Sequence, residues 1–544
     1  MNTMRRHETG RNWSMEIGAV ILAAIVLCVP QSAPGQCGEQ WFATDGVSGG
    51  TPPAVFAIKP WDPDGAGSQP ERLVIGGDFS AVGATPANNI AAWNGVAWET
   101  LGAGTNGRVY ALAVLPDNTL VAAGAFTMAG GASAPYIARW DGTAWSGLSL
   151  GMDNEVNDLA VLLNGDLIAG GMFGTAGGIG VNRIARWNGT AWSGLGSGVG
   201  GTVYALLVVP SSGDLIVGGM FTTAGGSTAL RVARWNGATW TGIGGMTGGS
   251  NVGVFSLCLM PNGDIVAGGN FTFPGSRVSR WNGTSWSGLG TGVNNAVWAL
   301  TVLESGDLIA GGSFISPSFA IARWNGTAWS GLGTGLAGGN VQAFEIRPNG
   351  DLLVGGAFTT AGGLASPGLA RWGTLAPSFL QQPLSIATCA SGSAMFTVVP
   401  DGTGPFTYTW EAELDPGIWT PVDDGNLVHG GIILGTVTGT GTPALLIEGL
   451  THFPEDRSSL NIRCNLTDSC GSTRSNTAVL SAWRIATGDA NGDGQCNGRD
   501  VPGFVEAVIH GGVPSAGFCA CDFTADGVVT AADVDGLISH MLLQ

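Results

Sequence analysis

The stretch Ala322-Arg323-Trp324-Asn325-Gly326-Thr327-Ala328-Trp329 recurs with small changes along the first two thirds of the chain. The leading tryptophans of its seven copies are Trp93, Trp140, Trp187, Trp235, Trp281, Trp324 and Trp372, with a period of 43 to 48 residues. A second marker, a Gly-Gly-x-Phe-like segment, also occurs seven times, at Phe79, Phe126, Phe173, Phe221, Phe271, Phe314 and Phe358. Blades of four strands have this period. We therefore expect a mainly β chain with a seven-bladed β-propeller over residues 36–376.

Alternation and turn residues divide each repeat into four strands, a to d. In the sixth repeat the expected strands are Val297–Val302, Asp307–Phe314, Ala320–Trp324 and Thr327–Leu332. Asn-Gly between strands c and d favours a two-residue type I′ turn, because both central residues need positive φ. That register would place Trp140 opposite Thr143, and Ala138 opposite Trp145.

The two ends of the repeat array predict how the ring closes. The last repeat stops at Trp372-Gly373 without its second tryptophan, whereas Trp41 near the N-terminus has no partner within its own segment. If the N-terminal segment supplied the outer strand of the last blade, no open sheet edge would remain. We expect Trp41 to complete the set of second tryptophans.

The charged side chains bound the classes of partner. The formal charge is −18 and Lys59 is the sole lysine, which argues against nucleic acid and anionic membranes. Arg5, Arg6 and Arg11 precede an apolar run over 17–29, a pattern typical of a secretory signal, here 1–35. We expect a secreted protein with no membrane span once the signal is removed. Its eight remaining cysteines favour disulfides.

Residues 377–485 predict a second β domain. Phe406-Thr-Tyr-Thr-Trp410, followed by Leu460-Asn-Ile-Arg-Cys464, resembles bacterial immunoglobulin-like (Ig-like) domains, in which a tryptophan packs in the core and a cysteine marks strand F. Of the possible disulfides here we prefer Cys389 with Cys470, which would leave Cys464 as a buried free thiol. We interpret this β-sandwich as a spacer rather than a ligand-binding domain.

Residues 486–544 contain two twelve-residue loops with calcium-binding spacing. A glycine at position 6 turns each loop sharply, so that its oxygen atoms converge on one ion. Position 7 contributes a backbone carbonyl, from Gln495 or Val528. The expected ligands of two Ca²⁺ ions are Asp489, Asn491, Asp493, Gln495, Asn497 and Asp500, and then Asp522, Thr524, Asp526, Val528, Thr530 and Asp533.

Each loop precedes an amphipathic helical pattern, over 501–508 and 534–541. The duplicated loop–helix unit resembles a type I dockerin domain. That resemblance implies calcium-dependent binding to a cohesin-like or other surface protein, often in polysaccharide catabolism. The usual recognition pair is replaced by Gly498-Arg499 and Ala531-Ala532, which leaves the partner undefined. Cys496 could bond to Cys519 or Cys521.

The propeller repeats resemble kelch-type repeats and the propellers of fungal cortical polarity markers. They contain no histidine, which argues against the copper sites of kelch-like oxidases and against a histidine triad. Asp153, Glu155 and Asp158 form an unusual acidic cluster in the third repeat, and we predict no catalytic residue from it. Any ligand should bind on the face with variable b-to-c and d-to-a loops. Strand a begins near that face with Phe56, Tyr110, Tyr204, Phe255 and Trp298.

Two further sets of charged residues recur with the blades. The arginine before each strand-c tryptophan is expected to form hydrogen bonds between blades, with anion binding as the alternative. These arginines are Arg139, Arg186, Arg234, Arg280, Arg323 and Arg371. Aspartates at the a-to-b turn should be structural, namely Asp166, Asp214, Asp264, Asp307 and Asp351.

Three functions fit these patterns. The favoured hypothesis is a secreted, non-enzymatic binding or adhesion protein whose propeller recognises a glycan or protein and whose tail docks through calcium. The second is a carbohydrate-active enzyme with its active site on the propeller, which would require two carboxylates within roughly 5 to 10 Å of each other. The third is a structural cell-surface component.

The calcium loops generate a direct prediction. So small a module depends on bound metal for its folding energy. We expect the isolated tail, 488–544, to gain ordered structure when titrated with Ca²⁺, as measured by circular dichroism. A spectrum that does not change with Ca²⁺ would refute the assignment of these ligands.

Overall fold

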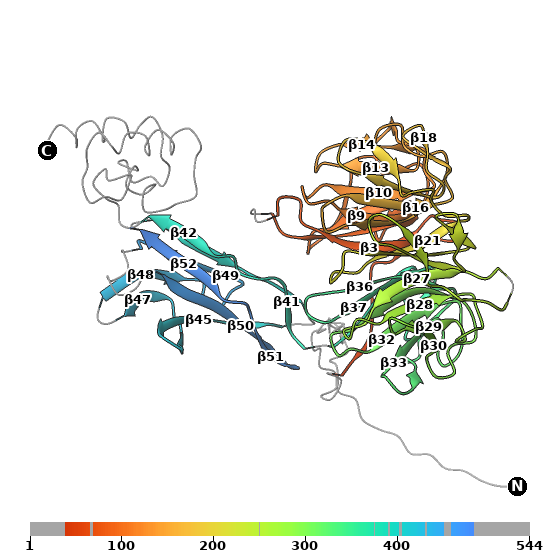
Figure 1. Cartoon of the computed structure of the whole chain (residues 1–544). Coiled ribbons are helices and arrows are strands. Elements are labelled where there is room, and N and C mark those ends of the chain that lie inside the picture. The colour runs from red at the N-terminus through yellow and green to blue at the C-terminus, as the bar shows by residue number, and fades with distance from the viewer. Residues whose placement is uncertain are drawn as a thin grey trace, which may run out of the picture. The chain divides into compact units, whose positions relative to one another are not determined.

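The computed structural model describes residues 38–65, 69–249, 251–374, 376–389, 392–401, 405–429, 432–450 and 459–483. All regular secondary structure within these ranges is β-strand (Figure 1). Over the same ranges no helix is long and apolar enough to cross a membrane. The predicted signal segment, 1–35, and the predicted calcium module, 486–544, lie outside the described residues.

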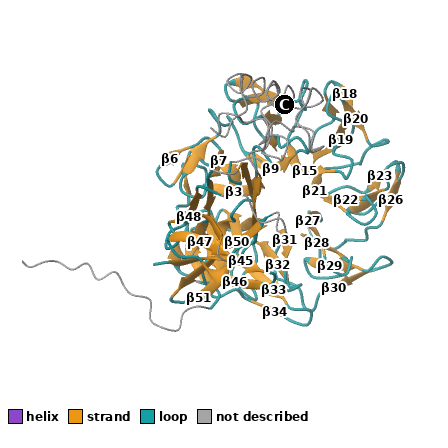
Figure 2. Cartoon of the chain, turned by 90° about the vertical axis from the view of Figure 1, so that its left-hand side faces the viewer, coloured by secondary structure: helices purple, strands orange, loops and turns teal. Residues whose placement is uncertain are grey.

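Seven four-stranded antiparallel sheets form the propeller. The innermost strands, a, are β3 (Ala54–Trp61), β9 (Val109–Val114), β15 (Val156–Val161), β21 (Val203–Val208), β27 (Val254–Leu259), β31 (Val297–Val302) and β36 (Val341–Ile346). Each inner strand contacts the inner strand of the next sheet, and β36 contacts β3, so the ring is closed. Figure 2 shows β9, β15, β21, β27 and β31 around the centre, with β20, β26 and β30 at the rim.

The outer strands follow the same order in every blade. Strands b are β4 (Arg72–Asp78), β10 (Leu120–Gly124), β16 (Leu167–Gly171), β22 (Leu215–Gly219), β28 (Ile265–Gly269), β32 (Leu308–Gly312) and β37 (Leu352–Gly356). Strands c are β7 (Ile90–Trp93), β13 (Ile137–Trp140), β19 (Ile184–Trp187), β25 (Val232–Trp235), β29 (Val278–Trp281), β33 (Ile321–Trp324) and β40 (Leu369–Gly373). Strands d are β8 (Trp98–Thr100), β14 (Trp145–Gly147), β20 (Trp192–Gly194), β26 (Trp240–Gly242), β30 (Trp286–Gly288), β34 (Trp329–Ser330) and β1 (Gln40–Ala43).

The N-terminal strand closes the last blade, as predicted. β1 pairs with β40, and Trp41 lies opposite Trp372. The Trp41 indole donates a hydrogen bond of 2.9 Å to the Leu332 carbonyl of the sixth blade. Five other strand-d tryptophans make the same bond to the preceding blade at 2.6 to 3.1 Å, namely Trp145, Trp192, Trp240, Trp286 and Trp329. The Trp41 bond therefore continues a series that ties neighbouring blades together.

The predicted c-to-d turn register is wrong. Trp140 pairs with Trp145, and Ala138 with Gly147, so four residues rather than two lie between the strands. The reason is the first loop residue: Asp141 Oδ1 accepts the N–H groups of Thr143 and Ala144, which caps a longer loop. The register consequently brings the two tryptophan rings against each other, with centroids 5.4 Å apart in this blade.

The strand-c arginines form ion pairs mainly inside their own blade, not between blades as expected, although Arg323 of the sixth blade also contacts Glu39 beside β1 of the last blade. Arg323 contacts Asp307 of the same sheet, and the pattern repeats for Arg186 with Asp166, Arg234 with Asp214, Arg280 with Asp264 and Arg371 with Asp351. The a-to-b turn leads directly into strand b, which pairs with strand c, so the turn aspartate lies beside the strand-c arginine. The predicted structural role of these aspartates is confirmed.

The b-to-c loops differ among blades. Five of them carry a short hairpin, formed by β5 (Ala81–Val82) with β6 (Thr85–Pro86), β11 (Met128–Ala129) with β12 (Ala132–Ser133), β17 (Thr175–Ala176) with β18 (Ile179–Gly180), β23 (Thr223–Ala224) with β24 (Ser227–Thr228), and β38 (Thr360–Ala361) with β39 (Leu364–Ala365). The first and last of these gain a third strand, β2 (Val47–Ser48) and β35 (Leu336–Ala337). This face of the propeller is therefore the variable one.

Residues 378–483 form further sheets. The larger sheet contains β42 (Ile386–Cys389), β52 (Ala478–Trp483), β50 (Leu460–Asp468), β45 (Thr407–Asp415), β46 (Ile418–Pro421) and β51 (Gly471–Arg474). The second contains β43 (Ala394–Thr397), β49 (Ala444–Glu448), β48 (Ile432–Thr438) and β47 (Gly425–His429), and a pair joins β41 (Ser378–Gln381) to β44 (Val399–Asp401). Strands of the two larger sheets share one buried core. Trp410 and Cys464 are fully buried neighbours in it.

The cysteines of this region confirm one expectation and correct another. Cys464 is a buried free thiol, as predicted. Cys470 is disulfide-bonded, but its partner is not Cys389. Cys389 pairs with Trp483, which lies beyond the first residue of β50, Leu460. Cys470 follows the last residue of β50, Asp468, and is therefore at the opposite end of the sheet. At about 3.3 Å per residue the two lie roughly 30 Å or more apart, and a disulfide needs Cα atoms within about 7 Å.

Ring closure predicts that Trp41 matters more than its counterpart in the first blade. Trp41 is 5% exposed and bonded to Leu332, whereas Trp98 is half-buried. We expect Trp41→Ala to lower the free energy of unfolding by about 3 to 5 kcal/mol, and Trp98→Ala by clearly less, in chemical denaturation of the full chain. Equal losses would contradict the closure role of β1.

Candidate functional site

Every inner strand carries a β-bulge at the same repeat position. In the third blade Val156 pairs with Gly171 and Asp158 with Gly170, so Asn157 between them has no partner in the ladder. The same shift occurs in the other six blades. We call the unpaired positions the bulge residues: Phe56, Tyr110, Asn157, Tyr204, Phe255, Trp298 and Gln342. A bulge re-aims the side chain at that point, and bulges gather next to functional sites.

The glycine that ends strand b, the second of a Gly-Gly doublet in six blades, explains where each bulge forms. A Cβ on the second glycine, such as Gly171, would lie 2.2 Å from the Glu155 carbonyl oxygen of the bulged strand. A Cβ on the first, Gly170, would lie 2.5 Å from the Val203 side chain of the next blade. A backbone oxygen cannot give way, so the second position is glycine in all seven blades, whereas the first position is Ala123 in the second blade. The second position therefore leaves room for the backbone of the bulged strand, and the first leaves room for a valine of the next blade.

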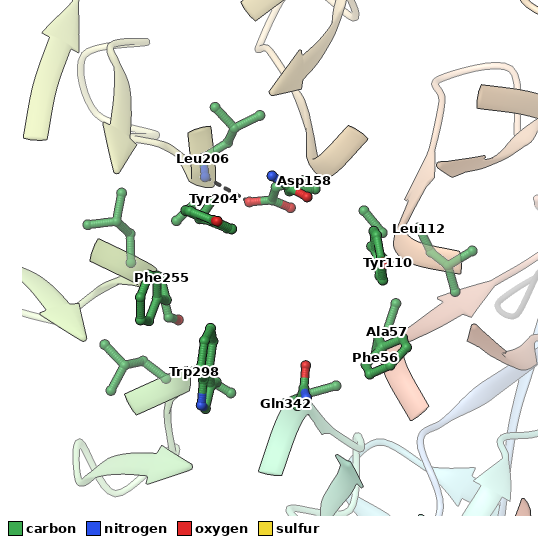
Figure 3. Close-up of a pocket in the computed structure, with 18 of the residues that line it drawn as sticks. Phe56, Ala57, Tyr110, Leu112, Asp158, Tyr204, Leu206, Phe255, Trp298 and Gln342 are labelled. Atoms are coloured by element: carbon green, nitrogen blue, oxygen red, sulfur yellow. Dashed lines mark hydrogen bonds between the residues drawn. The ribbon is translucent and has the colours of Figure 1, made fainter. Parts of the chain in front are cut away.

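The bulge residues line a central cavity of about 460 Å³ on the variable face. Figure 3 shows Trp298 and Phe255 on one side of its open centre, Tyr110 and Phe56 on the other, and Asp158 across from Gln342. The five aromatic residues singled out in the sequence are thus brought together. Asn157 and Gln342 were missed, although each follows a strand-a valine in the same way as the aromatic residues do.

The aromatic side chains support one another around the wall. Phe255 stacks on Trp298 with ring centroids 4.3 Å apart and an interplanar angle of 8°. Tyr204 meets Phe255 edge-on at 5.3 Å, and Phe56 meets Tyr110 edge-on at 5.5 Å. Such pairs fix ring orientations beyond what area burial alone would do. The cavity therefore has two rigid aromatic walls.

Three side chains of the bulge ring each donate one N–H to the protein itself. Asn157 donates to the Val203 carbonyl at 2.7 Å, which bridges two blades. Gln342 donates to Asn340 at 3.1 Å, and the Trp298 indole donates to Ser313 Oγ at 2.9 Å. The amide oxygens of Asn157 and Gln342 make no hydrogen bond to the described residues.

Two carboxyl groups line the cavity, and they differ in their surroundings. Asp158 accepts the N–H groups of Leu206 at 2.7 Å and Leu159 at 2.8 Å, the former across the blade interface. Burial raises the pKa of Asp158 to about 7, although these two N–H groups and Lys59 oppose the rise. Glu155 is half-buried, and its carboxyl group has no hydrogen-bond or ion-pair partner among the described residues.

The third member of the predicted acidic cluster does not belong to the cavity. Asp153 is exposed and accepts the N–H groups of Gly174 and Thr175 in its own b-to-c loop, at 2.8 and 3.0 Å. Its role is to cap that loop. Only Glu155 and Asp158 of the cluster therefore face a ligand.

The predicted calcium ligands, from Asp489 to Asp533, all lie outside the described residues. Within the ranges that the structure does describe, no three His, Cys, Asp or Glu side chains are grouped to hold a metal ion. The cavity lining combines the aromatic rings, the two amides and the two carboxyl groups with aliphatic side chains such as Leu206 and Leu300.

Comparison with known proteins supports the propeller. Residues 115–140 match a family described as a domain of unknown function (DUF5122) beta-propeller. No curated protein matches the chain.

Solved structures match a smaller part of the chain. A chimeric titin Z1Z2 carrying an exogenous decorin peptide is 21% identical over 20% of this chain and 95% of its own, with a TM-score of 0.14. The N-terminal Ig1-2 module of the Drosophila receptor protein tyrosine phosphatase DLAR is 20% identical over 20% of this chain and 50% of its own, with a TM-score of 0.15. The twitchin kinase region from C. elegans is 14% identical over 21% of this chain and 18% of its own, with a TM-score of 0.14.

The raised pKa of Asp158 predicts a pH dependence of stability. The folded chain keeps a proton on Asp158 up to about pH 7, whereas the unfolded chain loses it near pH 3.8. The free energy of unfolding should therefore fall as pH rises through this window, by up to about 1.4 kcal/mol per pH unit per group. Burial raises the pKa of Glu345 to about 7 as well, which adds to the same slope.

Denaturation of the full chain at pH 5 and pH 7.5 checks this dependence. Asp158→Asn cannot ionise and should make the slope between these pH values shallower. The matched control is Asp423→Asn, because Asp423 is exposed on the second domain. A slope that Asp158→Asn leaves unchanged would show that this carboxyl titrates normally in the folded chain.

Proposed function

We propose that this protein is a secreted modular binding protein whose propeller takes its ligand in the central cavity, between the bulge residues. The observation that carries the proposal is a contrast within the repeats. All seven blades have a valine before the bulge residue, and all seven have a buried phenylalanine two residues after the glycine that ends strand b. The bulge position alone holds phenylalanine, tyrosine, tryptophan, asparagine and glutamine.

This variety supports a role in recognition. If the bulge residues served only to pack the ring, we would expect the same type of residue at this position in every blade. Instead the scaffold around them repeats while the side chains that reach the cavity differ. Concave sites with aromatic walls and a few placed polar groups are the usual form of a small-ligand site. The cavity volume of about 460 Å³ suits a ligand of modest size.

The other modules complete the proposal. The two sheets of residues 378–483, with Trp410 and Cys464 buried side by side, support an Ig-like spacer. The spacing of the carboxylates from Asp489 to Asp533 supports a dockerin-like tail that binds two Ca²⁺ ions and docks on a cohesin-like or other surface protein. We place the protein outside the cell or at its surface, in accord with the expected signal segment, 1–35.

A second candidate function rests on the two carboxyl groups in the cavity. Asp158, with its pKa of about 7, could act as a general acid beside Glu155 in glycan hydrolysis. Against this role, both Asp158 oxygens accept backbone N–H groups. Release of reducing ends from a panel of polysaccharides, lost in both Asp158→Asn and Glu155→Gln, would favour the enzyme over the binding protein.

The binding proposal is tested with a defined panel of small ligands and the full chain. The panel contains neutral sugars, uronic acids, amino acids and alkylamines, and binding is detected by saturation-transfer NMR. We expect at least one class to bind, and Trp298→Ala and Tyr110→Ala each to weaken it at least tenfold by removing an aromatic wall. Met128→Ala, at an exposed b-to-c hairpin outside the cavity, is the control. Binding that survives both cavity substitutions would place the ligand elsewhere and contradict the proposal.

A further inference from the structure

We infer that the central cavity binds an organic cation with N–H groups, such as an alkylammonium or guanidinium group on an aliphatic chain. The inference rests on the proposed function and names the chemical class of its ligand. Three properties of the cavity lead to it: its free hydrogen-bonding atoms, its charge and its aromatic faces.

The hydrogen-bonding atoms left free in the cavity are mainly acceptors. Asn157, Gln342 and Trp298 already spend N–H donors on Val203, Asn340 and Ser313, and the two amide oxygens remain. The Glu155 carboxylate adds two acceptor oxygens. The second N–H of each amide and the hydroxyl groups of Tyr204 and Ser256 can also donate, and they are the exceptions. A ligand that satisfies this wall must therefore bring donors.

The charge of the cavity also favours a ligand that is a cation. Its lining contains two carboxyl groups and no lysine or arginine among the described residues. The nearby Arg108 is paired with Asp78 at 2.8 Å. Lys59 acts on Asp158 but does not line the cavity. Glu155 is thus a carboxylate without a counter-ion in the described part of the chain, which a cation would neutralise in a partly desolvated site.

Glu155 lies close enough to the aromatic walls to act together with them. Burial is the main cause of the raised pKa of Tyr110 and Tyr204, and the charge of Glu155 is the second cause. The two tyrosines belong to the blades on either side of Glu155. The faces of aromatic rings attract cations electrostatically. The Trp298 ring is covered by Phe255 on one face and the cavity lies on its other side, opposite Tyr110 (Figure 3). A cation held by Glu155 would sit between these rings.

A neutral sugar uses the same features less fully. Its C–H faces could stack on Trp298, and its hydroxyl groups could donate to the free oxygens. Each hydroxyl is also an acceptor, and an acceptor left without a donor in a desolvated site weakens binding. An ammonium group has three donors and no acceptor, so it leaves no such atom unsatisfied. The acceptor-rich wall therefore favours the cation.

The test uses n-butylammonium and its uncharged analogue n-butanol with the full chain, by isothermal titration calorimetry and saturation-transfer NMR. We expect n-butylammonium to bind and n-butanol to bind at least tenfold more weakly. Glu155→Gln should weaken n-butylammonium binding at least tenfold, and Glu155→Asp, which keeps the charge, should restore most of it. Glu304→Gln is the matched control, because Glu304 is exposed at an a-to-b turn away from the cavity.

Thermal unfolding of each variant verifies that the cavity remains folded. Equal binding of n-butylammonium by Glu155→Gln, or no binding by the unaltered chain, would overturn the inference. If instead a neutral sugar bound in a manner sensitive to Trp298→Ala and insensitive to Glu155→Gln, the proposed function would stand and the cationic class of ligand would fall. The two failures are therefore distinguishable.

Discussion

Close approach of backbone to backbone at the glycine doublets is the constraint on which the rest of the propeller depends. A Cβ on Gly171 would meet the Glu155 carbonyl oxygen at 2.2 Å, and the equivalent glycines of the other blades meet their bulged strand at 2.0 to 2.1 Å. Because the bulge can form only against such a glycine, the position of this glycine in strand b determines which residue of strand a is unpaired. The same contact in each of the seven blades places seven bulge residues around one cavity.

This constraint separates the parts of the repeat that hold the ring from the part that can vary. The first glycine receives a valine of the next blade, and the strand-d tryptophan bonds to a carbonyl of the preceding one. These contacts run through most of the ring and include its closure, where Trp41 bonds to Leu332. The bulge residue makes none of the contacts that define the repeat. It is consequently free to differ from blade to blade, and this freedom permits an asymmetric site within a regular scaffold.

The sequence predicted features that depend on counting and on equal spacing, such as the number of blades and the role of Trp41. It was less informative where one side chain or one register position decides the outcome. Asp141 accepts two N–H groups and lengthens the c-to-d turn, which a dipeptide rule does not foresee. Cys389 and Cys470 were placed on suitable strands but at opposite ends of them.

The candidate site was predicted in part. The five aromatic residues were found because their type is conspicuous at the start of strand a, and Asp158 because it replaces a small residue. Asn157 and Gln342 were missed because an amide at that position attracts no notice until the bulge shows that it shares the position of the aromatic side chains. The hydrogen bonds that occupy their donors depend on the folded backbone around them, which no local pattern reveals.

The most direct measurement is the free energy of unfolding of Gly171→Ala compared with Gly180→Ala. Gly171 faces the bulge that contains Asn157, whereas Gly180 is exposed, and a Cβ added there would have no atom within 4 Å. We predict a loss of about 1 to 3 kcal/mol or more for Gly171→Ala, and a change within about 0.5 kcal/mol for Gly180→Ala. Equal effects of the two substitutions would contradict the claim that the glycine doublet builds the ring of bulge residues.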